Sequence, residues 1–304
     1  MGDVNVKGFL TLSRLPFLLP GLAALITGIS IALIQGYELD FGLGAISLAG
    51  LSFIMLATYY LNEYFDYEGD SINKGFTKFS GGSRAIIDLD VPRRTAKLAG
   101  MLSIAILASI MCVYFIFYFE DYPFLVVFAL AGAFFGIFYS SPPFKWAYRG
   151  VGEILIGLCY GLLAVVSGYY LVTSDLSQMA LMISLPASSS IIGVILANEL
   201  SDFEADKIVG KKNIVVRAGL KNGAAIYAAS MAVLYPLMVL SIISGVNQMI
   251  ILIGIPVLIF SLVPILLLRN GGYSDRGKQM KISGLTLIAN LLSSLLFIMA
   301  FVIQ

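Results

Sequence analysis

The sequence has no histidine, only two cysteines and few charges. Charged residues make up 12% of its 304 residues, whereas hydrophobic residues make up 59%. Without histidine, there is no imidazole to serve as an acid, a base or a zinc ligand. Cys112 and Cys159 both lie inside apolar runs, where small packing residues are expected rather than disulfide partners. The composition predicts a chain that resides in a lipid bilayer.

Long apolar runs dominate the chain. Runs long enough to cross a hydrocarbon core of about 30 Å predict nine transmembrane helices, at 15–35, 44–66, 95–118, 122–140, 151–173, 177–202, 223–243, 247–268 and 280–303. They lack the two-residue alternation of a membrane β-barrel. We therefore expect residues 1–304 to form one all-α transmembrane domain. Residues 1–12 show no clear cleavage site, so no removable signal peptide is predicted.

Basic residues are confined to alternate loops. Nine spans place all 19 Lys and Arg residues on one side of the membrane. The charged residues of the opposite loops are all acidic, and they are Glu38, Asp40, Glu120, Asp121 and Asp175. By the positive-inside rule the basic side is cytoplasmic. The chain is thus predicted to be a multi-pass protein of the cell membrane, with Met1 inside and Gln304 outside.

One polar motif occurs twice at the predicted cytoplasmic side. Residues 62–70 and 198–206 both read N-E-x-x-D-x-x-x-D. The offset of 136 residues, 198 minus 62, corresponds to four spans. This recurrence predicts two parallel four-helix repeats, at about 15–140 and 151–268, followed by an extra helix at about 280–303.

The spacing within each motif places its polar side chains on one helical face, because positions i, i+4 and i+8 lie close together around a helix. Hard oxygen ligands of this kind favour Mg²⁺. Acidic residues can also simply be the solvated ends of membrane helices, but recurrence of the whole pattern at the same depth favours a site. The predicted metal ligands are Asn62, Asp66, Asp70, Asn198, Asp202 and Asp206.

Glycines and basic residues follow both motifs, a combination that suits phosphate oxygens. Most of these cations are explained as topology determinants. Arg84, which closes a glycine turn, and Lys207, which directly follows Asp206, are exceptions. Lys211, in the run after the second motif, is also expected to contact a diphosphate, whereas Arg14, just before Pro16, is explained equally well as an ordinary interfacial residue.

A third polar segment ends the fourth predicted span, at the double proline of Pro142 and Pro143. It places Tyr139, Ser140 and Lys145 on the same side as the two motifs. An ordinary interfacial turn with an aromatic residue explains this segment equally well.

With these residues in view, the chain resembles the UbiA superfamily of intramembrane prenyltransferases over nearly its whole length. That family carries aspartate-rich motifs on the second and sixth of nine helices, which matches residues 62–70 and 198–206. The run from Asn198 to Lys207, continued by Gly210-Lys211-Lys212 and Val216-Arg217-Ala218-Gly219, is most similar to the menaquinone-type branch. Glu63, where Asp is common, and Asn213, where Thr is common, depart from the pattern.

The resemblance implies a catalytic site for transfer of an isoprenyl group. Mg²⁺ held by Asn62, Asp66, Asp202 and Asp206, with support from Asp70, would bind an isoprenyl diphosphate. Tyr139 and Ser140 would face the acceptor or the cation. The implied partners are the diphosphate, a lipophilic aromatic acceptor and the bilayer, without nucleic acid. The cations implied to neutralise the leaving diphosphate are Arg14, Arg84, Lys145 and Lys207.

Two alternatives remain open at the level of sequence. The same chemistry could alkylate a glyceryl phosphate, as in archaeal ether lipid synthesis. A secondary transporter could also be built from two repeats, although its ionisable residues would be expected near the bilayer midplane rather than at one end.

Overall fold

The computed structural model describes residues 6–303. The predicted positions of the termini, Met1 and Gln304, and the first residues of the segment examined for a signal peptide lie outside this range. Within it the chain forms helices and turns, and no strand is present. The all-α fold predicted from the apolar runs is confirmed.

The helices of the N-terminal part are α1 (Val6–Leu12), η1 (Leu15–Leu18), α2 (Leu19–Ile34), α3 (Phe41–Phe65), α4 (Tyr67–Ile72), α5 (Ala85–Asp88), α6 (Arg93–Phe117) and α7 (Phe124–Ile137). Those that follow are η2 (Trp146–Tyr148), α8 (Gly152–Ile156), η3 (Gly157–Leu163), α9 (Ala164–Thr173), α10 (Gln178–Ile208), α11 (Ile214–Ala218), α12 (Leu220–Leu240), η4 (Ser241–Ser244), α13 (Ile250–Ile253), α14 (Ile255–Leu267), η5 (Arg269–Ser274) and α15 (Arg276–Val302).

Eight helical stretches among the described residues are long and apolar enough to cross a membrane. They correspond to eight of the nine predicted spans. The remaining predicted span, 122–140, contains α7, a shorter apolar helix of 14 residues. The protein is therefore a multi-pass membrane protein, whereas the count of nine spans and the division into two repeats stay predictions.

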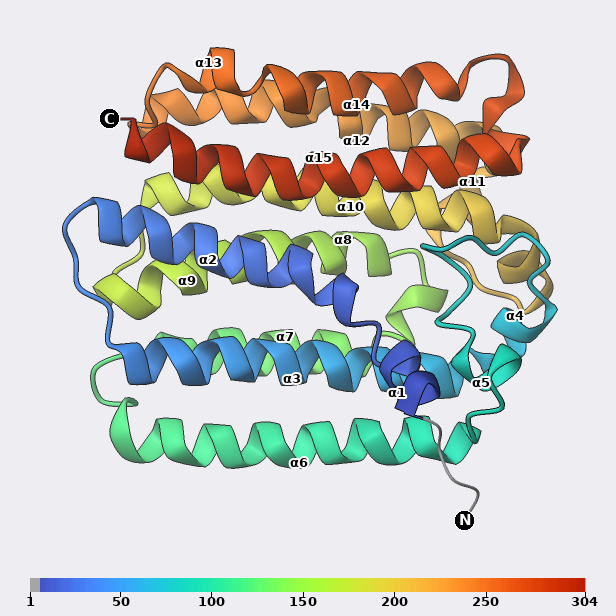
Figure 1. The fold of residues 1–304 in the computed structure, drawn as a ribbon, viewed down its shortest axis with the longest axis horizontal. Helices are drawn as coiled ribbons and strands as arrows, with labels where there is room; N and C mark the ends of the chain where they lie inside the picture. The colour runs from blue at the N-terminus through green and yellow to red at the C-terminus, as the bar shows by residue number, and fades with distance from the viewer. Residues whose placement is uncertain (1–5, 304) are drawn as a thin grey trace.

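Helix α10 occupies the middle of the bundle and packs against α12, α15 and η3 (Figure 1). Its sequence explains this position, because small residues occur all around it, and a helix that is small and apolar on every side can be enclosed by neighbours. Ala187, Ser190, Gly193 and Ala197 are all buried. The second motif lies at the end of this enclosed helix.

Helices α2 and α9 cross with their backbones in contact at Gly28 and Gly168. A Cβ added at Gly28 would lie 2.0 Å from the carbonyl oxygen of Val165, and one added at Gly168 would lie 2.1 Å from that of Leu25. Only glycine permits this approach, which brings the two halves of the chain together in the bilayer.

The segments rich in basic residues lie at one end of the bundle, where α4, α5, α11 and η5 are found (Figure 1). Both motif-bearing helices, α3 and α10, reach this end with their C-termini. The topology thus places two motifs that are far apart in sequence at the same end of the fold.

Candidate active site

The two motifs line one polar cavity. The cavity lies where α3 and α4 approach the C-terminal part of α10, and all six predicted metal ligands contribute to its wall, namely Asn62, Asp66, Asp70, Asn198, Asp202 and Asp206. The second motif lies on an unbroken helix, as expected. The first does not, because α3 ends at Phe65 and Asp66 forms the junction with α4.

Asp66 is buried and held by two groups from the segment between α7 and α8. The Ser140 hydroxyl donates a 2.7 Å hydrogen bond to Oδ2, and the Tyr148 hydroxyl donates a 2.8 Å hydrogen bond to Oδ1. Hydrogen bonds from two directions fix the carboxylate, since each accepts on a different oxygen. Ser140 therefore positions Asp66 in this structure.

Lys211 is the cation between the two motifs. Its Nζ lies 3.6 Å from Asp66 Oδ2 and 3.2 Å from Asp206 Oδ1. Burial alone would lower the pKa of Lys211, but the carboxylates of Asp66 and Asp206 raise it well above its usual value. Asp206 also accepts a 2.8 Å hydrogen bond from the Asn213 side-chain amide. Lys211 thus stays charged and joins the two aspartates electrostatically.

Asp202 is held by the loop that follows the first motif. The side-chain amide of Asn73 donates a 2.7 Å hydrogen bond to Oδ1, and the backbone N–H of Gly81 donates a 3.1 Å hydrogen bond to Oδ2. Gly81 has a φ of 77°, a left-handed conformation that glycine adopts without strain. The loop after one motif therefore supports an aspartate of the other.

Glu63 connects the loop after the first motif with Arg14, which follows helix α1. Its carboxylate accepts hydrogen bonds from the Ser83 N–H at 2.6 Å and the Ser83 hydroxyl at 2.7 Å. Arg14 Nη1 lies 3.6 Å from Glu63 Oε1. Glu63 is thus a buried structural anchor, and it holds Arg14 at the edge of the cavity.

Asp70 lies in the short helix α4, outside the spans. Burial, followed by the neighbouring carboxylate of Asp66, raises the pKa of Asp70 well above its usual value. Carboxylates crowded in this way are stabilised by a cation placed among them. Gly82 gives Asp70 room, because an added Cβ would lie 2.4 Å from its Oδ2.

The donor set fits a hard cation such as Mg²⁺. The side-chain carbonyl oxygens of Asn62 and Asn198 are buried without a hydrogen-bond partner, although buried polar atoms are normally paired. Both residues line the cavity beside the carboxylates. Within residues 6–303 no three acidic or thiol side chains already converge as a ligand cluster. Lys211 lies between Asp66 and Asp206.

The structure separates the predicted cations into two groups. Arg14 and Lys211 line the polar cavity. Arg84 instead pairs with Asp88, with an Nη2–Oδ1 distance of 2.9 Å, and donates to the backbone carbonyl of Asp70. Lys145 lies 5.1 Å from the centre of the Tyr148 ring, and the exposed Lys207 lies 6.0 Å from that of Phe203.

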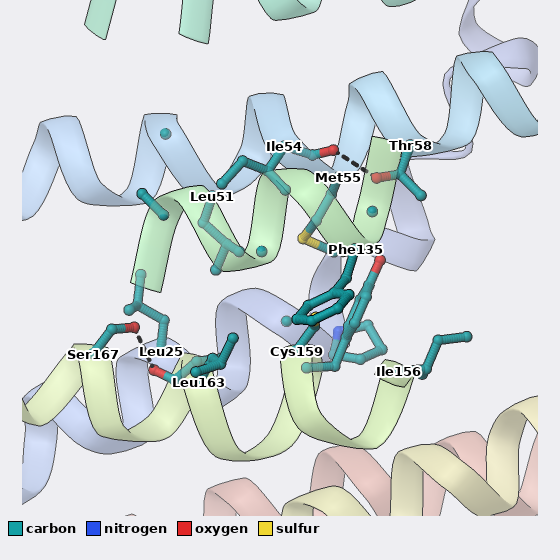
Figure 2. A pocket seen from close by; sticks show the side chains of 18 of the residues that line it. Leu25, Leu51, Ile54, Met55, Thr58, Phe135, Ile156, Cys159, Leu163 and Ser167 are labelled. Carbon is teal, nitrogen blue, oxygen red and sulfur yellow. Dashed lines mark hydrogen bonds between the residues drawn. The ribbon is translucent and has the colours of Figure 1, made fainter. Parts of the chain in front are cut away.

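An apolar chamber continues from the polar cavity into the membrane region. Arg14, Asn62, Tyr139, Ile195 and Asn198 line both spaces, so they form the junction. Figure 2 shows side chains of α3 facing those of η3 and α9 across the chamber.

The hydroxyl groups in this wall do not make it polar. Thr58 donates to the carbonyl of Ile54, and Ser167 to that of Ala164, each within its own helix (Figure 2). The chamber therefore offers an apolar surface, and its hydrogen-bonding groups are concentrated at the junction with the polar cavity.

Several site residues were not found from the sequence. Tyr148, Asn73 and Asn213 each bind a motif aspartate. Tyr148 ends the short helix η2, and the two asparagines flank helix ends, where single polar residues carry no spacing signal. Glu199 also lines the cavity, buried and with one carboxylate oxygen unpaired. The sequence did contain a signal for Glu199, because the Asn-Glu pair occurs in both motifs and Glu63 is its counterpart in the first.

Fold and site together define a class: a multi-pass helical membrane protein in which paired acidic motifs close the end of an apolar chamber. Residues 21–302 match the UbiA prenyltransferase family. The chain belongs to this family, and the resemblance predicted from its motifs is confirmed.

Two curated relatives are named as transferases of a naphthoate or a naphthoquinone. The chain is 27% identical over 197 residues to 1,4-dihydroxy-2-naphthoate octaprenyltransferase of Bacillus subtilis, and this alignment covers 63% of this chain and 60% of the relative. It is 31% identical over 102 residues to 2-carboxy-1,4-naphthoquinone phytyltransferase of Synechocystis, and this alignment covers 34% of this chain and 33% of the relative. The aligned region thus covers less than two thirds of either relative.

Solved structures share the fold. A UbiA homolog from Archaeoglobus fulgidus, bound to GPP and Mg²⁺, has a TM-score of 0.67 at 16% identity and covers 96% of this chain and 99% of its own. A UbiA homolog from Aeropyrum pernix K1 has a TM-score of 0.68 at 15% identity and covers 95% and 98%. A digeranylgeranylglyceryl phosphate synthase has a TM-score of 0.60 at 20% identity and covers 98% and 99%.

Proposed function

We propose that this protein is a Mg²⁺-dependent intramembrane prenyltransferase that transfers an isoprenyl group from its diphosphate to an aromatic acceptor. The observation that carries the proposal is the junction of two unlike spaces. A polar cavity with six oxygen-bearing motif residues opens into an apolar chamber, and five residues line both. An isoprenyl diphosphate has the same two halves, a polyanionic head and an apolar tail.

The residues of the polar cavity would hold the metal and the diphosphate. Asn62, Asp66, Asn198, Asp202 and Asp206 would hold the metal, with Asp70 in support. Bound Mg²⁺ supplies positive charge that stabilises a leaving diphosphate. Arg14 and Lys211 add fixed positive charge at the cavity wall, and fixed charges aimed at a developing anion lower the barrier to bond cleavage.

The reaction would break the bond between the first carbon of the isoprenyl group and the diphosphate oxygen. An electron-rich carbon of the acceptor ring would form the new bond, and the ring would then lose a proton. The apolar wall of the chamber would keep water away from the allylic cation. Tyr139 lines both spaces and is proposed to contact the acceptor or the cation.

An aromatic acceptor is supported by the names of the two curated relatives, one of which refers to a naphthoate and the other to a naphthoquinone. The structural similarity to a glyceryl phosphate enzyme reflects the shared fold at 20% identity. We further propose that the basic end of the bundle is cytoplasmic, because the segments that carry Lys and Arg share that end.

A direct test uses the purified protein in proteoliposomes with labelled geranylgeranyl diphosphate. Parallel reactions contain 1,4-dihydroxy-2-naphthoate, 4-hydroxybenzoate or a glyceryl phosphate, each with Mg²⁺ or with EDTA. The proposal predicts a Mg²⁺-dependent prenylated naphthoate, with diphosphate released in equal amount. Prenylation of only the glyceryl phosphate would refute the aromatic acceptor, and no Mg²⁺-dependent product with any acceptor would refute the reaction.

A further inference from the structure

Helix α15 carries neither motif but is fixed to the helix that carries the second. The buried side-chain amide of Asn290 donates a 2.8 Å hydrogen bond to the Ser190 hydroxyl of α10. The side-chain amide of Gln279 donates a 3.0 Å hydrogen bond to the carbonyl of Leu200, two residues before Asp202. Hydrogen bonds between membrane helices help to fix how the helices lie against each other. The start of α15 is therefore held beside the second motif (Figure 1).

The first turn of α15 also holds the loop that follows the first motif, residues 73–84. The Arg276 guanidinium donates a 2.8 Å hydrogen bond to the backbone carbonyl of Phe76. Its Cζ lies 5.3 Å from the centre of the Phe76 ring, and the Cζ of Arg84 lies 4.2 Å from the same centre. Cations at these distances are attracted to an aromatic ring. Arg276 thus connects α15 to loop 73–84 through both the backbone and the side chain of Phe76.

Phe79 makes a second contact between this loop and α15. A Cβ added at Gly284 of α15 would lie 3.4 Å from Cζ of the Phe79 ring, so the ring packs against the helix at a position without a side chain. Phe79 also lines the polar cavity, together with Ser80, Gly81 and Gly82. The loop therefore contacts α15 and forms part of the cavity wall.

The loop needs support from outside because its own backbone is permissive. Gly81 and Gly82 have φ values of 77° and 72°, and glycine adopts this region about as readily as the usual one. Yet Gly81 and Asn73 must lie where they bind the two carboxylate oxygens of Asp202. Ordering such a segment costs conformational entropy, which the contacts of Phe76 with α15 help to offset.

We propose that Arg276 is a positioning residue, which holds loop 73–84 through Phe76 in the conformation that orients Asp202. The proposal rests on the proposed function in one respect, because it takes Asp202 as a metal ligand. Arg276 is exposed and is not among the described residues that line the polar cavity, so it acts only through the loop. Loss of its contacts should weaken metal binding without removing any group from the cavity.

The first experiment measures turnover of geranylgeranyl diphosphate with 1,4-dihydroxy-2-naphthoate across Mg²⁺ concentrations. Arg276→Ala should raise the Mg²⁺ concentration for half-maximal rate about tenfold and lower kcat at saturating Mg²⁺ less than about threefold, because excess metal restores the bound state by mass action. Arg276→Lys keeps the charge and a donor but not the planar guanidinium, and should shift this concentration about threefold or less. Lys281→Ala removes an exposed cation from the same helix and should leave it unchanged.

A double-mutant cycle tests the connection through Phe76. Phe76→Leu removes the ring and keeps the backbone carbonyl. If Arg276 acts through Phe76, combining Arg276→Ala with Phe76→Leu should shift the Mg²⁺ requirement by less than the product of the two single shifts, because residues in contact are not independent. Single shifts that simply multiply would overturn this connection.

Limited proteolysis reports on the loop without any turnover. Lys74 and Lys78 are exposed residues of the loop, and trypsin cleaves after lysine in segments that open locally. Cleavage after these two residues, identified by mass spectrometry, should be at least about fivefold faster in Arg276→Ala than in the wild-type protein, because it follows the population of the open loop. Lys281→Ala should show the wild-type rate.

Wild-type cleavage in Arg276→Ala would overturn the proposal, because Arg276 would not hold the loop. Faster cleavage with a wild-type Mg²⁺ requirement would also overturn it, because the loop would not orient Asp202. Failure of the proposed function is distinguishable, since it leaves the wild-type protein without turnover, whereas loop cleavage can still be compared. In that case Mn²⁺ binding, measured by electron paramagnetic resonance, replaces the Mg²⁺ titration. Binding about tenfold weaker in Arg276→Ala would support the positioning role, and wild-type affinity would refute it.

Discussion

The two motifs have matching sequences but different structural support. Asp66 lies at a helix break, where it accepts hydrogen bonds from Ser140 and Tyr148, which belong to a third segment. Asp202 lies on the unbroken helix α10 and is held by Asn73 and Gly81, from the loop after the first motif. The comparison teaches that a repeated motif fixes which side chains reach the site, whereas the groups that orient them come from segments without any repeat.

Removing either aspartate should have the largest effect. We expect Asp66→Ala and Asp202→Ala each to reduce turnover at least about 100-fold, since loss of one group that stabilises transition-state charge commonly costs that much. Diphosphate release from membranes with matched expression provides the measurement. Asp88→Ala is the control, because Asp88 is an exposed acid that contacts only Arg84 among the pairs described. Full activity in either motif variant would show that the aspartate of that motif is not needed for catalysis.

Lys211 connects the two motifs, so its removal should affect both. Lys211→Met should lower kcat/KM about 30-fold, because truncating one partner of a buried charge pair costs about 2 kcal/mol or more. Lys207→Met should change kcat/KM by about twofold or less, since this exposed residue lies off the cavity wall. Equal losses in the two variants would show that the position of Lys211 between Asp66 and Asp206 is not what matters.

Tyr148 tests the support specific to the first motif. Tyr148→Phe keeps the ring near Lys211 and removes only the hydrogen bond to Asp66, which should lower kcat about tenfold because bonds to charged groups contribute about 1.5 kcal/mol or more. Rate measurements across Mg²⁺ concentrations would show whether more Mg²⁺ restores activity. A variant with wild-type kinetics at all concentrations would argue that Ser140 alone suffices to hold Asp66.

Asn73 tests the corresponding support of the second motif. Asn73→Ala should raise KM for the donor about tenfold, because a hydrogen bond to a charged group contributes about 1.5 kcal/mol or more. The Gly81 N–H still binds Asp202 in this variant, as the Ser140 hydroxyl still binds Asp66 in Tyr148→Phe. Steady-state kinetics measure the change in KM, and a loss as large as that of Asp202→Ala would indicate that the whole loop depends on Asn73.

Much of the fold followed from the sequence, and so did the set of motif residues that line the polar cavity. Apolar run length dictates membrane helices, and the repeated spacing of Asn62 and Asn198 predicted the helical face that lines this cavity. The support of Asp66 did not follow. This residue lies at the break between α3 and α4 and accepts hydrogen bonds from Ser140 and Tyr148, which tertiary packing supplies.

The roles of the basic residues also could not be predicted from the sequence. Lys207 and Lys211 lie one turn apart in a charged segment, and only the path of the chain after α10 directs Lys211 into the cavity. Arg84 looked suited to phosphate because of its glycine turn, yet its guanidinium pairs with Asp88, one helical turn away. Spacing predicts faces of a helix, but it cannot decide which partner a long side chain in a loop selects.

The central claim is that both motifs hold one shared set of metal ions with the donor. Electron paramagnetic resonance with Mn²⁺ as a stand-in for Mg²⁺ tests it on the purified protein, in the presence of the non-reactive geranylgeranyl S-thiolodiphosphate. The account predicts that Asp66→Ala and Asp202→Ala each abolish most of the donor-dependent Mn²⁺ binding seen in the wild-type protein. Wild-type Mn²⁺ binding in either single variant would contradict it.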